Sequence, residues 1–382
     1  MSGLFAKLPI SEIASVERGK FSARPRNDPR YYGGNIPFLQ TGDIARAGRF
    51  IIGWDQTLNA QGLAVSRLFH RGTIFMSIAA NVGDVAISTF DAACPDSVVA
   101  VIPKNGADAE WLFQILRHSK DELSSLATQN AQANLSLEKI IPFKVPVPPL
   151  PEQRKIAEIL RTWDEAIEKL EALRAAKLRR LEGLAAHLIH EAQAEPQHLR
   201  EHIKEVSERN KGQNVNRILS VTNSKGFALA EDQFAHRVAS ADISNYKIVR
   251  KGQYAYNPSR INVGSIARLD DWPEGALSPM YVVFEVLDTL YADFFGHWLR
   301  SAEARKRIAL AAQGSVRDTV SFGDLGSILI PLPSLDEQRR IARALTTAKR
   351  EIGLLEAEIK ALTRQKRGLM RKLLTGEWRV AV

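Results

Sequence analysis

The stretch PVPPLPEQRKIAEIL at residues 146–160 returns as PLPSLDEQRRIARAL at residues 331–345. The two stretches align without a gap at an offset of 185 residues, and the match continues over about 40 residues, through Gly183 and Gly368. Self-similarity of this length indicates a repeated structural unit. The chain is therefore expected to consist of two related halves.

Each copy of the repeat predicts the start of a helix. Its prolines cannot continue an incoming element, and helical periodicity begins at the Glu-Gln-Arg. In the second copy Ser334 and Glu337 have the spacing of a capping box. In the first copy Pro149 replaces that serine, and Pro151 suits the first turn of a helix.

Beyond each start, apolar residues recur at alternating spacings of four and three, which is typical of a coiled-coil seam. The seam of the first copy is Ile156, Leu160, Trp163, Ile167, Leu170, Arg174, Lys177, Leu181, Leu184 and Leu188. The seam of the second copy is Ile341, Leu345, Ala348, Ile352, Leu355, Ile359, Leu362, Lys366, Leu369 and Leu373. From residue 341 to residue 373 such a helix rises about 50 Å. We expect the two helices to pair antiparallel; the alternative is that each packs only on its own domain.

The segments before the two helices repeat more weakly. Asn81-Val82-Gly83 recurs as Asn262-Val263-Gly264, within segments that resemble short paired strands around a glycine turn. A helix and a polar loop follow in both halves, and the loops differ. The predicted fold class is α+β, with two similar mixed α/β domains separated by two long helices that form an antiparallel coiled coil. The predicted domains are residues 1–145 and 196–330, and the predicted helices are residues 146–195 and 331–382.

Composition sets the class of protein. The 382 residues are 45% hydrophobic and 25% charged, as in ordinary globular proteins. The single cysteine, Cys94, suits a reducing compartment, and no stretch approaches the length of a membrane span, so a cytoplasmic protein without membrane association is expected. The formal net charge is +9, and residues 331–382 hold most of the excess. A basic helix is commonly a solvated surface, so charge alone does not establish DNA binding.

The paired modules, each ending in a proline-rich turn, Glu-Gln-Arg and a long helix, resemble the DNA-specificity (S) subunit of type I restriction-modification systems. The resemblance spans essentially the whole chain. It implies that each recognition domain reads one half of an asymmetric, bipartite site in double-stranded DNA, and that the helices set the gap between the halves. It also implies a non-catalytic chain that recruits two methyltransferase (modification) subunits, which motor-nuclease (restriction/translocase) subunits can join. S-adenosylmethionine, ATP and Mg²⁺ would then bind the partner subunits, with no cofactor in this chain.

Base reading requires side chains with fixed donors and acceptors, typically Arg or Lys for guanine and Asn or Gln for adenine. The candidates in the first domain are Arg24, Arg26, Arg30, Gln40, Thr41, Asn81, Gln129, Asn130 and Gln132. The candidates in the second domain are Asn223, Ser224, Lys225, Ser259, Arg260, Asn262, Gln313, Ser315 and Arg317. Several of these residues would contact only phosphates. The identical recurrence of Asn81 and Asn262 favours a structural turn over base reading.

Residues of the two long helices are the candidates for the coiled coil and for subunit assembly. They are Gln153, Arg154, Ile156, Leu160, Trp163, Ile167, Leu170, Gly183, Gln338, Arg339, Ile341, Leu345, Ile352, Leu355, Ile359, Leu362 and Gly368. The recurring Gly183 and Gly368 suggest close approach by another helix, because glycine is unfavourable inside a helix. Basic residues of the second helix, Lys349 and Arg350 among them, are available to partners or phosphates.

Motifs of catalysis are missing from the sequence. The nearest approaches to a methyltransferase motif, Asp28-Pro29-Arg30-Tyr31 and Asn257-Pro258-Ser259-Arg260, lack the second proline, and no Walker-type phosphate loop occurs. The histidines show no metal-ligand spacing. Three alternatives stay open: a catalytic fusion, the specificity subunit of a related type II-like methyltransferase-nuclease system, and a coiled-coil scaffold without DNA readout.

Overall fold

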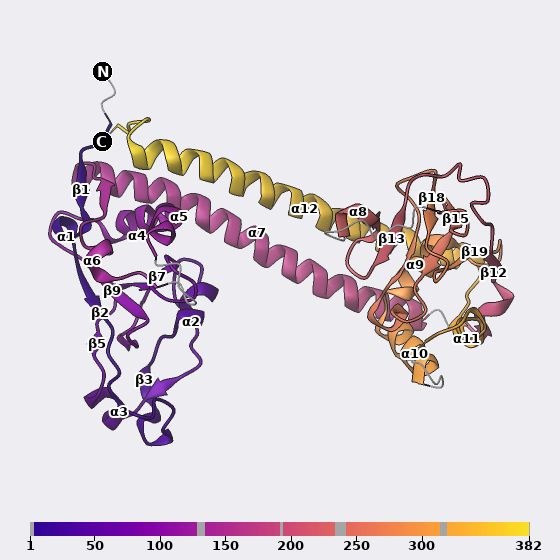
Figure 1. Ribbon diagram of the computed structural model, residues 1–382, viewed down its shortest axis with the longest axis horizontal. Helices are drawn as coiled ribbons and strands as arrows, with labels where there is room; N and C mark the ends of the chain where they lie inside the picture. The colour runs from indigo at the N-terminus through magenta and orange to yellow at the C-terminus, as the bar shows by residue number, and fades with distance from the viewer. Residues whose placement is uncertain (1–3, 128–133, 192–193, 234–241, 314–318, 382) are drawn as a thin grey trace. The chain divides into compact units, whose positions relative to one another are not determined.

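The computed structural model describes residues 4–127, 134–191, 194–233, 242–313 and 319–381 (Figure 1). The chain forms two compact units. Met1–Leu170 and Glu358–Val382 make the first unit, and Glu171–Ala357 makes the second. The helices α7 (Leu150–Glu191) and α12 (Leu335–Thr375) each contribute one half to each unit.

The first unit is built on a four-stranded antiparallel sheet. Its strand order is β2 (Ala14–Arg18), β9 (Val98–Pro103), β6 (Ile74–Ser77) and β7 (Val85–Ile87). Three two-stranded ribbons accompany it: β1 (Lys7–Pro9) with β10 (Lys144–Pro146), β3 (Tyr32–Pro37) with β4 (Thr57–Leu58), and β5 (Leu68–Phe69) with β8 (Ala92–Ala93). The helices before α7 are α1 (Ile10–Ile13), η1 (Pro29–Tyr31), α2 (Thr41–Arg46), α3 (Ala60–Ala64), α4 (Ala109–His118), α5 (Lys120–Ser125) and α6 (Leu137–Ile140).

The second unit repeats this topology. Its four-stranded antiparallel sheet has the order β12 (Ile203–Val206), β19 (Val282–Val286), β16 (Tyr254–Tyr256) and β17 (Ile266–Arg268). Its ribbons are β11 (Pro196–His198) with β20 (Leu329–Pro331), β13 (Leu219–Thr222) with β14 (Gly226–Leu229), and β15 (Lys247–Arg250) with β18 (Glu274–Leu277). Its helices between α7 and α12 are η2 (Leu199–Glu201), α8 (Ala230–Gln233), η3 (Ile261–Val263), α9 (Ala292–Leu299), α10 (Ala302–Gln313) and α11 (Phe322–Ser327).

Each hydrophobic core includes the start of one long helix and the end of the other. In the first unit, Leu160 of α7 and Leu373 of α12 join the core that contains Trp111 of α4. In the second unit, Leu345 of α12 and Ile189 of α7 join the core that contains Trp298 of α9. Within each unit the two helix halves therefore run antiparallel, as drawn in Figure 1. The prediction of two similar mixed α/β domains with two long antiparallel helices is confirmed.

The coiled-coil seam follows the register expected from the sequence. All twenty seam residues are buried or half-buried, including the polar Arg174, Lys177 and Lys366. In the second unit Arg174 pairs with Glu356 at 3.4 Å, and Lys177 pairs with Glu351 at 2.6 Å. In the first unit Lys366 pairs with Asp164. The polar interruptions of the seam are therefore sites of ion pairing between the helices.

The start of α12 differs from the capping box that its sequence predicts. The Ser334 hydroxyl accepts a hydrogen bond from the Glu337 amide at 3.3 Å, as expected. The reciprocal bond from the Ser334 amide to the Glu337 carboxylate is not made; this carboxylate accepts two hydrogen bonds from the Arg340 guanidinium instead, at 2.6 and 2.9 Å. Half of the predicted box is therefore correct.

Candidate DNA interface

The glutamine of the repeated motif fastens each long helix to its recognition domain. The Gln153 side chain accepts a hydrogen bond from the Asp108 amide at 2.8 Å and donates to the carbonyls of Gly106 and Pro148. Asp108 is the N-cap residue of α4. Both Gln153 and Gln338 are 1% exposed, so neither side chain is presented to an outside partner.

Gln338 makes the same three contacts in the second unit. Its side chain accepts from the Tyr291 amide at 2.7 Å and donates to the carbonyls of Thr289 and Pro333. Tyr291 is the N-cap residue of α9. The two glutamines thus identify α4 and α9 as equivalent elements, with an offset of 183 residues.

A buried polar cluster joins the long helices to α4 in the first unit. The Asp164 carboxylate contacts Lys366 and accepts a hydrogen bond from the Gln114 amide at 2.9 Å. The Arg117 guanidinium lies 3.3 Å from the same carboxylate. Burial, offset in part by Asp164, lowers the pKa of Lys366. The charges of this cluster are satisfied within the unit.

The arginines of the first predicted DNA-contacting loop are engaged by acceptors of the same unit. Arg24 donates to the carbonyls of Phe21 and Ala23. Arg26 pairs with Asp96, and Arg30 pairs with Asp28, both at 2.7 Å. Exposed ion pairs of this kind contribute only about 0–1 kcal/mol, so DNA phosphates can compete for both guanidinium groups.

The other candidates of the first domain lie at turns and helix ends. Gln40 precedes α2, where its amide donates to Gln56 at 3.1 Å, and Thr41 is the first residue of that helix. Asn81 is exposed in the turn between β6 and β7. Gln129, Asn130 and Gln132 lie outside the described residues.

The repeated Asn-Val-Gly turn has a backbone conformation at its third position that favours glycine. Gly83 has φ +84° and Gly264 has φ +95°, in the left-handed region that glycine adopts readily. Asn262 is exposed, as are Ser259 and Arg260 nearby. Whether either asparagine reads a base stays a prediction.

The second unit brings three predicted residues into one cavity. Asn223, Ser224 and Lys225 form the turn between β13 and β14 and line a cavity of about 740 Å³ together with Val263 and Gly264. All three turn residues are exposed. Ser315 and Arg317 lie outside the described residues, and Gln313 ends α10 with its side chain outside the description.

Three arginines that also line this cavity were not among the predicted residues. Arg268 on β17 pairs with Asp270 at 2.6 Å and with Asp293 at 2.7 Å. Arg300, Arg305 and Lys349 also line the cavity. Arg300 follows the last residue of α9, and no short motif marks it, so only the equivalence of α4 and α9 could have indicated it. Lys349 was expected only as a basic residue of the helix.

Histidine and lysine side chains beside this cavity have shifted pKa values. Burial, reinforced by Arg300 and Lys349, lowers the pKa of His297 to about 4. Burial, reinforced by Arg300, also lowers the pKa of Lys349. The imidazole of His297 donates to or accepts from the Thr346 hydroxyl at 2.9 Å, depending on its tautomer. The His297 imidazole is therefore uncharged at neutral pH, and the positive charges beside it are those of Arg300 and Lys349.

Both helix glycines face open space. A Cβ atom placed at Gly183 or at Gly368 would meet no described atom within 4 Å, the helix's own nearby backbone aside. The expected close approach by another helix is thus not made by the described parts of this chain. Arg154 and Arg339 are exposed at the equivalent starts of α7 and α12.

The described residues contain neither a membrane-spanning helix nor a group of metal ligands. None of the described helices combines the length and apolar character required to cross a membrane. In the same residues, no three His, Cys, Asp or Glu side chains are grouped so that they could hold a metal ion.

Known proteins resemble this chain, one of them along most of its length. The putative type I restriction enzyme MjaX specificity subunit of Methanocaldococcus jannaschii is 24% identical over 417 residues, covering 97% of this chain and 93% of that protein. The type I restriction enzyme MjaIX specificity subunit of the same organism is 27% identical over 164 residues, covering 42% of this chain and 38% of that protein.

Solved structures share the fold. The crystal structure of a type I restriction-modification system S subunit from M. genitalium matches with a TM-score of 0.60 at 16% identity, covering 97% of this chain and 96% of that one. A structure described as showing complex assembly and conformational transition of the type I R-M system matches with the same score and identity, covering 98% of each chain. At these identities the likeness concerns the fold alone.

A family model described as the type I restriction modification DNA specificity domain matches residues 5–178 and 237–364. The matched ranges include most of α7 and α12 and the cavity-lining Arg268, Arg300 and Lys349. The chain therefore belongs to the family of type I restriction-modification DNA specificity proteins.

Proposed function

We propose that this chain selects the DNA sequence on which a type I restriction-modification complex acts, with each recognition domain reading one half of a bipartite site. The observation that carries the proposal is one scaffold presenting unlike side chains in its two copies. The sheet order is the same in both units. At the ribbon turns, the second unit presents Asn223, Ser224 and Lys225, and nothing in the first unit repeats this sequence. Loops on a shared framework are where differing specificity is expected.

The proposal includes the partners and the division of chemistry. Two methyltransferase subunits, and a restriction subunit where one exists, would bind the chain and carry S-adenosylmethionine, ATP and Mg²⁺. This chain would contribute no catalytic group and would act in the cytoplasm. The open positions at Gly183 and Gly368 offer places where a partner helix can approach closely.

Mapping of methylated bases tests the reading role of the second domain. The complex would be expressed with Asn223, Ser224 and Lys225 all replaced by alanine, and methylation would be mapped across a genome. We expect one half of the methylated sequence to become degenerate and the other half to persist, because only one reader is altered. A Lys211→Ala variant is the control, since Lys211 is exposed in the same unit and does not line the cavity. An unchanged methylated sequence would contradict the proposal.

A direct assay tests the absence of catalysis. The purified full-length chain would be incubated with DNA, S-adenosylmethionine and Mg²⁺ without any partner subunit. We expect neither methyl transfer nor cleavage by the chain alone. Methyl transfer should appear when the methyltransferase subunits are added. Turnover by the chain alone would instead establish the catalytic-fusion alternative.

A further inference from the structure

The two units carry different side chains at the positions where the long helices contact the recognition domain. The offset of 183 residues set by the two glutamine contacts equates Gln114 with His297 and Arg117 with Arg300. The helix offset of 185 residues equates Asp164 with Lys349 and Lys366 with Leu181. The carboxylate at the centre of the first cluster is therefore replaced by a lysine in the second unit.

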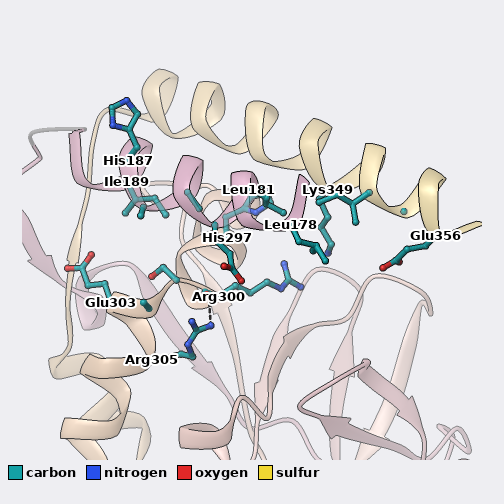
Figure 2. A pocket seen from close by; sticks show the side chains of 17 residues that line it. Leu178, Leu181, His187, Ile189, His297, Arg300, Glu303, Arg305, Lys349 and Glu356 are labelled. Carbon is teal, nitrogen blue, oxygen red and sulfur yellow. Dashed lines mark hydrogen bonds between the residues drawn. The ribbon is translucent and has the colours of Figure 1, made fainter. Parts of the chain in front are cut away.

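This replacement places a lysine beside Arg300 at the wall of a cavity. A cavity of about 1000 Å³ lies between the last turns of α7, the α9–α10 junction and α12. Figure 2 shows Lys349, His297 and Arg300 at its wall, beside the apolar Leu178 and Leu181. Figure 2 also shows the Arg305 side chain close to Arg300, whose carbonyl accepts a hydrogen bond from Arg305 at 2.8 Å.

Most carboxylates around this site are occupied by other cations. Glu303 pairs with Arg307, and Glu356 pairs with Arg174. On the neighbouring cavity, Asp270 and Asp293 both pair with Arg268. In the described parts of the chain, no carboxylate lies within 4.0 Å of the charged nitrogens of Arg300, Arg305 or Lys349. These three residues form what we call the cationic surface.

The cationic surface is continuous with the predicted reading turn. Arg300, Arg305 and Lys349 line both the cavity of Figure 2 and the cavity that contains Asn223, Ser224 and Lys225. Burial is the main cause of the lowered pKa of Lys349, and the like charge of Arg300 lowers it further. An anion at this place would relieve that repulsion.

We propose that the cationic surface binds the phosphate backbone of the DNA whose bases the Asn223–Lys225 turn reads. This inference rests on the proposed function and assigns to α12 a direct contact with DNA. Phosphate contacts fix the register and orientation of a protein on the duplex and carry no sequence information themselves. The first unit would lack the equivalent contact, because Arg117 and Lys366 both already pair with Asp164.

The salt dependence of DNA binding tests this assignment. Binding of the full-length chain to a fluorescent duplex of random sequence would be measured by anisotropy between about 50 and 200 mM salt. Each lost phosphate contact should reduce the slope of log K against log salt by about 0.9. For the double variant Arg300→Gln with Lys349→Gln we expect this slope to fall by about 2. The fall should be equal on two duplexes of unrelated sequence. Lys349→Arg, which keeps the charge, should leave the slope unchanged. Circular-dichroism melting would verify that each variant folds.

Arg350→Gln is the matched control. Arg350 is exposed on the same helix, next to Lys349 in sequence, and it lines neither cavity. Removal of one positive charge at this position, half of the change in the double variant, should leave the slope as in the wild type. A comparable loss for Arg350→Gln would show a general charge effect and would overturn the assignment.

The remaining outcomes separate this inference from the proposed function. If the folded double variant keeps the wild-type salt slope, the inference is overturned and the proposed function is not. If that variant also loses its association with methyltransferase subunits, the cationic surface binds an acidic protein partner instead of DNA. A loss confined to one duplex sequence would indicate base reading and would also overturn it. Failure of the wild-type chain to bind any duplex, alone and with methyltransferase subunits, would overturn the proposed function as well.

Discussion

At the scale of single residues, the repeated Glu-Gln-Arg motif shows what a sequence can and cannot reveal. The motif predicts the helix start correctly, because prolines and helical periodicity are local signals. The role of its glutamine depends on backbone groups 45 and 47 residues away, so no local pattern predicts it. The same glutamine contacts in both units explain why Gln153 and Gln338 share one residue type.

Replacement of Gln153 by alanine should destabilise the first unit. The change leaves the Asp108 amide and the carbonyls of Gly106 and Pro148 without this partner in a buried place, which we expect to cost about 3 kcal/mol. Urea unfolding measures the loss. Arg154→Ala, at the exposed neighbour, should change the free energy of unfolding by less than about 0.5 kcal/mol. Equal stabilities of the two variants would contradict the fastening role.

His297 should make the second unit sensitive to mild acid. Its pKa is lowered to about 4 in the folded protein, whereas an unfolded histidine titrates near 6.5. Between these values the unfolded state binds the proton and the folded state does not, so stability falls as pH falls below about 6.5. We expect a loss of about 1 kcal/mol between pH 7 and pH 5, since the side chain is only half-buried.

The variant His297→Gln tests that pH dependence. Glutamine is the residue at the equivalent position of the first unit, Gln114, and it does not titrate. Thermal unfolding of the wild type and the variant at pH 7 and pH 5 should show a smaller acid-induced loss in the variant. If the wild type and the variant lose the same stability between pH 7 and pH 5, groups other than His297 cause the acid sensitivity.

At the scale of elements, the seam of the long helices is the best-predicted feature of the fold. Its spacing of four and three residues identifies the buried stripe of both helices, including the polar positions. The partners of those polar residues were not predictable, because an antiparallel register is fixed by the domains in which the helices begin and end. Asp164 in particular lies outside the apolar seam, and only the folded first unit brings it to Lys366.

The ion pair of Lys366 with Asp164 should be required for stability in the first unit. Lys366→Leu, which introduces the residue of the other repeat, leaves a buried carboxylate with fewer partners, and we expect a loss of about 2–4 kcal/mol. Replacement of both Asp164 and Lys366 by leucine should recover only part of that loss, because Gln114 and Arg117 then lose the carboxylate that they contact. Urea unfolding of the single and double variants measures the coupling between them. Lys360→Leu, at an exposed position of α12, should have little effect.

At the scale of the whole molecule, the chain order and the folding units differ. The sequence repeat predicts one domain before each long helix. The two domains do have the same sheet order, as this prediction requires. The compact units divide both long helices, however. The second half of α12, within Glu358–Val382, belongs to the same unit as the N-terminal domain. Sequence alone did not reveal this exchange, because the buried positions of α12 do not indicate which core they enter.

Deletion of residues 358–382 should therefore damage the N-terminal domain. The change removes Leu373 and Leu374 from its core and takes Arg379 from Glu152. Hydrogen exchange should become faster in β6 and β9 and stay slow in β16 and β19 of the other unit. Deletion of residues 381–382 alone is the control. Unchanged protection of β6 and β9 would show that this domain does not need the end of the chain.

The exchange of helix halves has a consequence for biosynthesis. As the polypeptide leaves the ribosome, the first domain emerges early, yet the leucines that complete its core, Leu373 and Leu374, are translated only after the whole of Glu171–Ala357. Throughout elongation the nascent first domain must expose the apolar surface that these leucines later cover. A stalled or prematurely terminated polypeptide would keep that surface exposed, which makes it a substrate for chaperones and proteases.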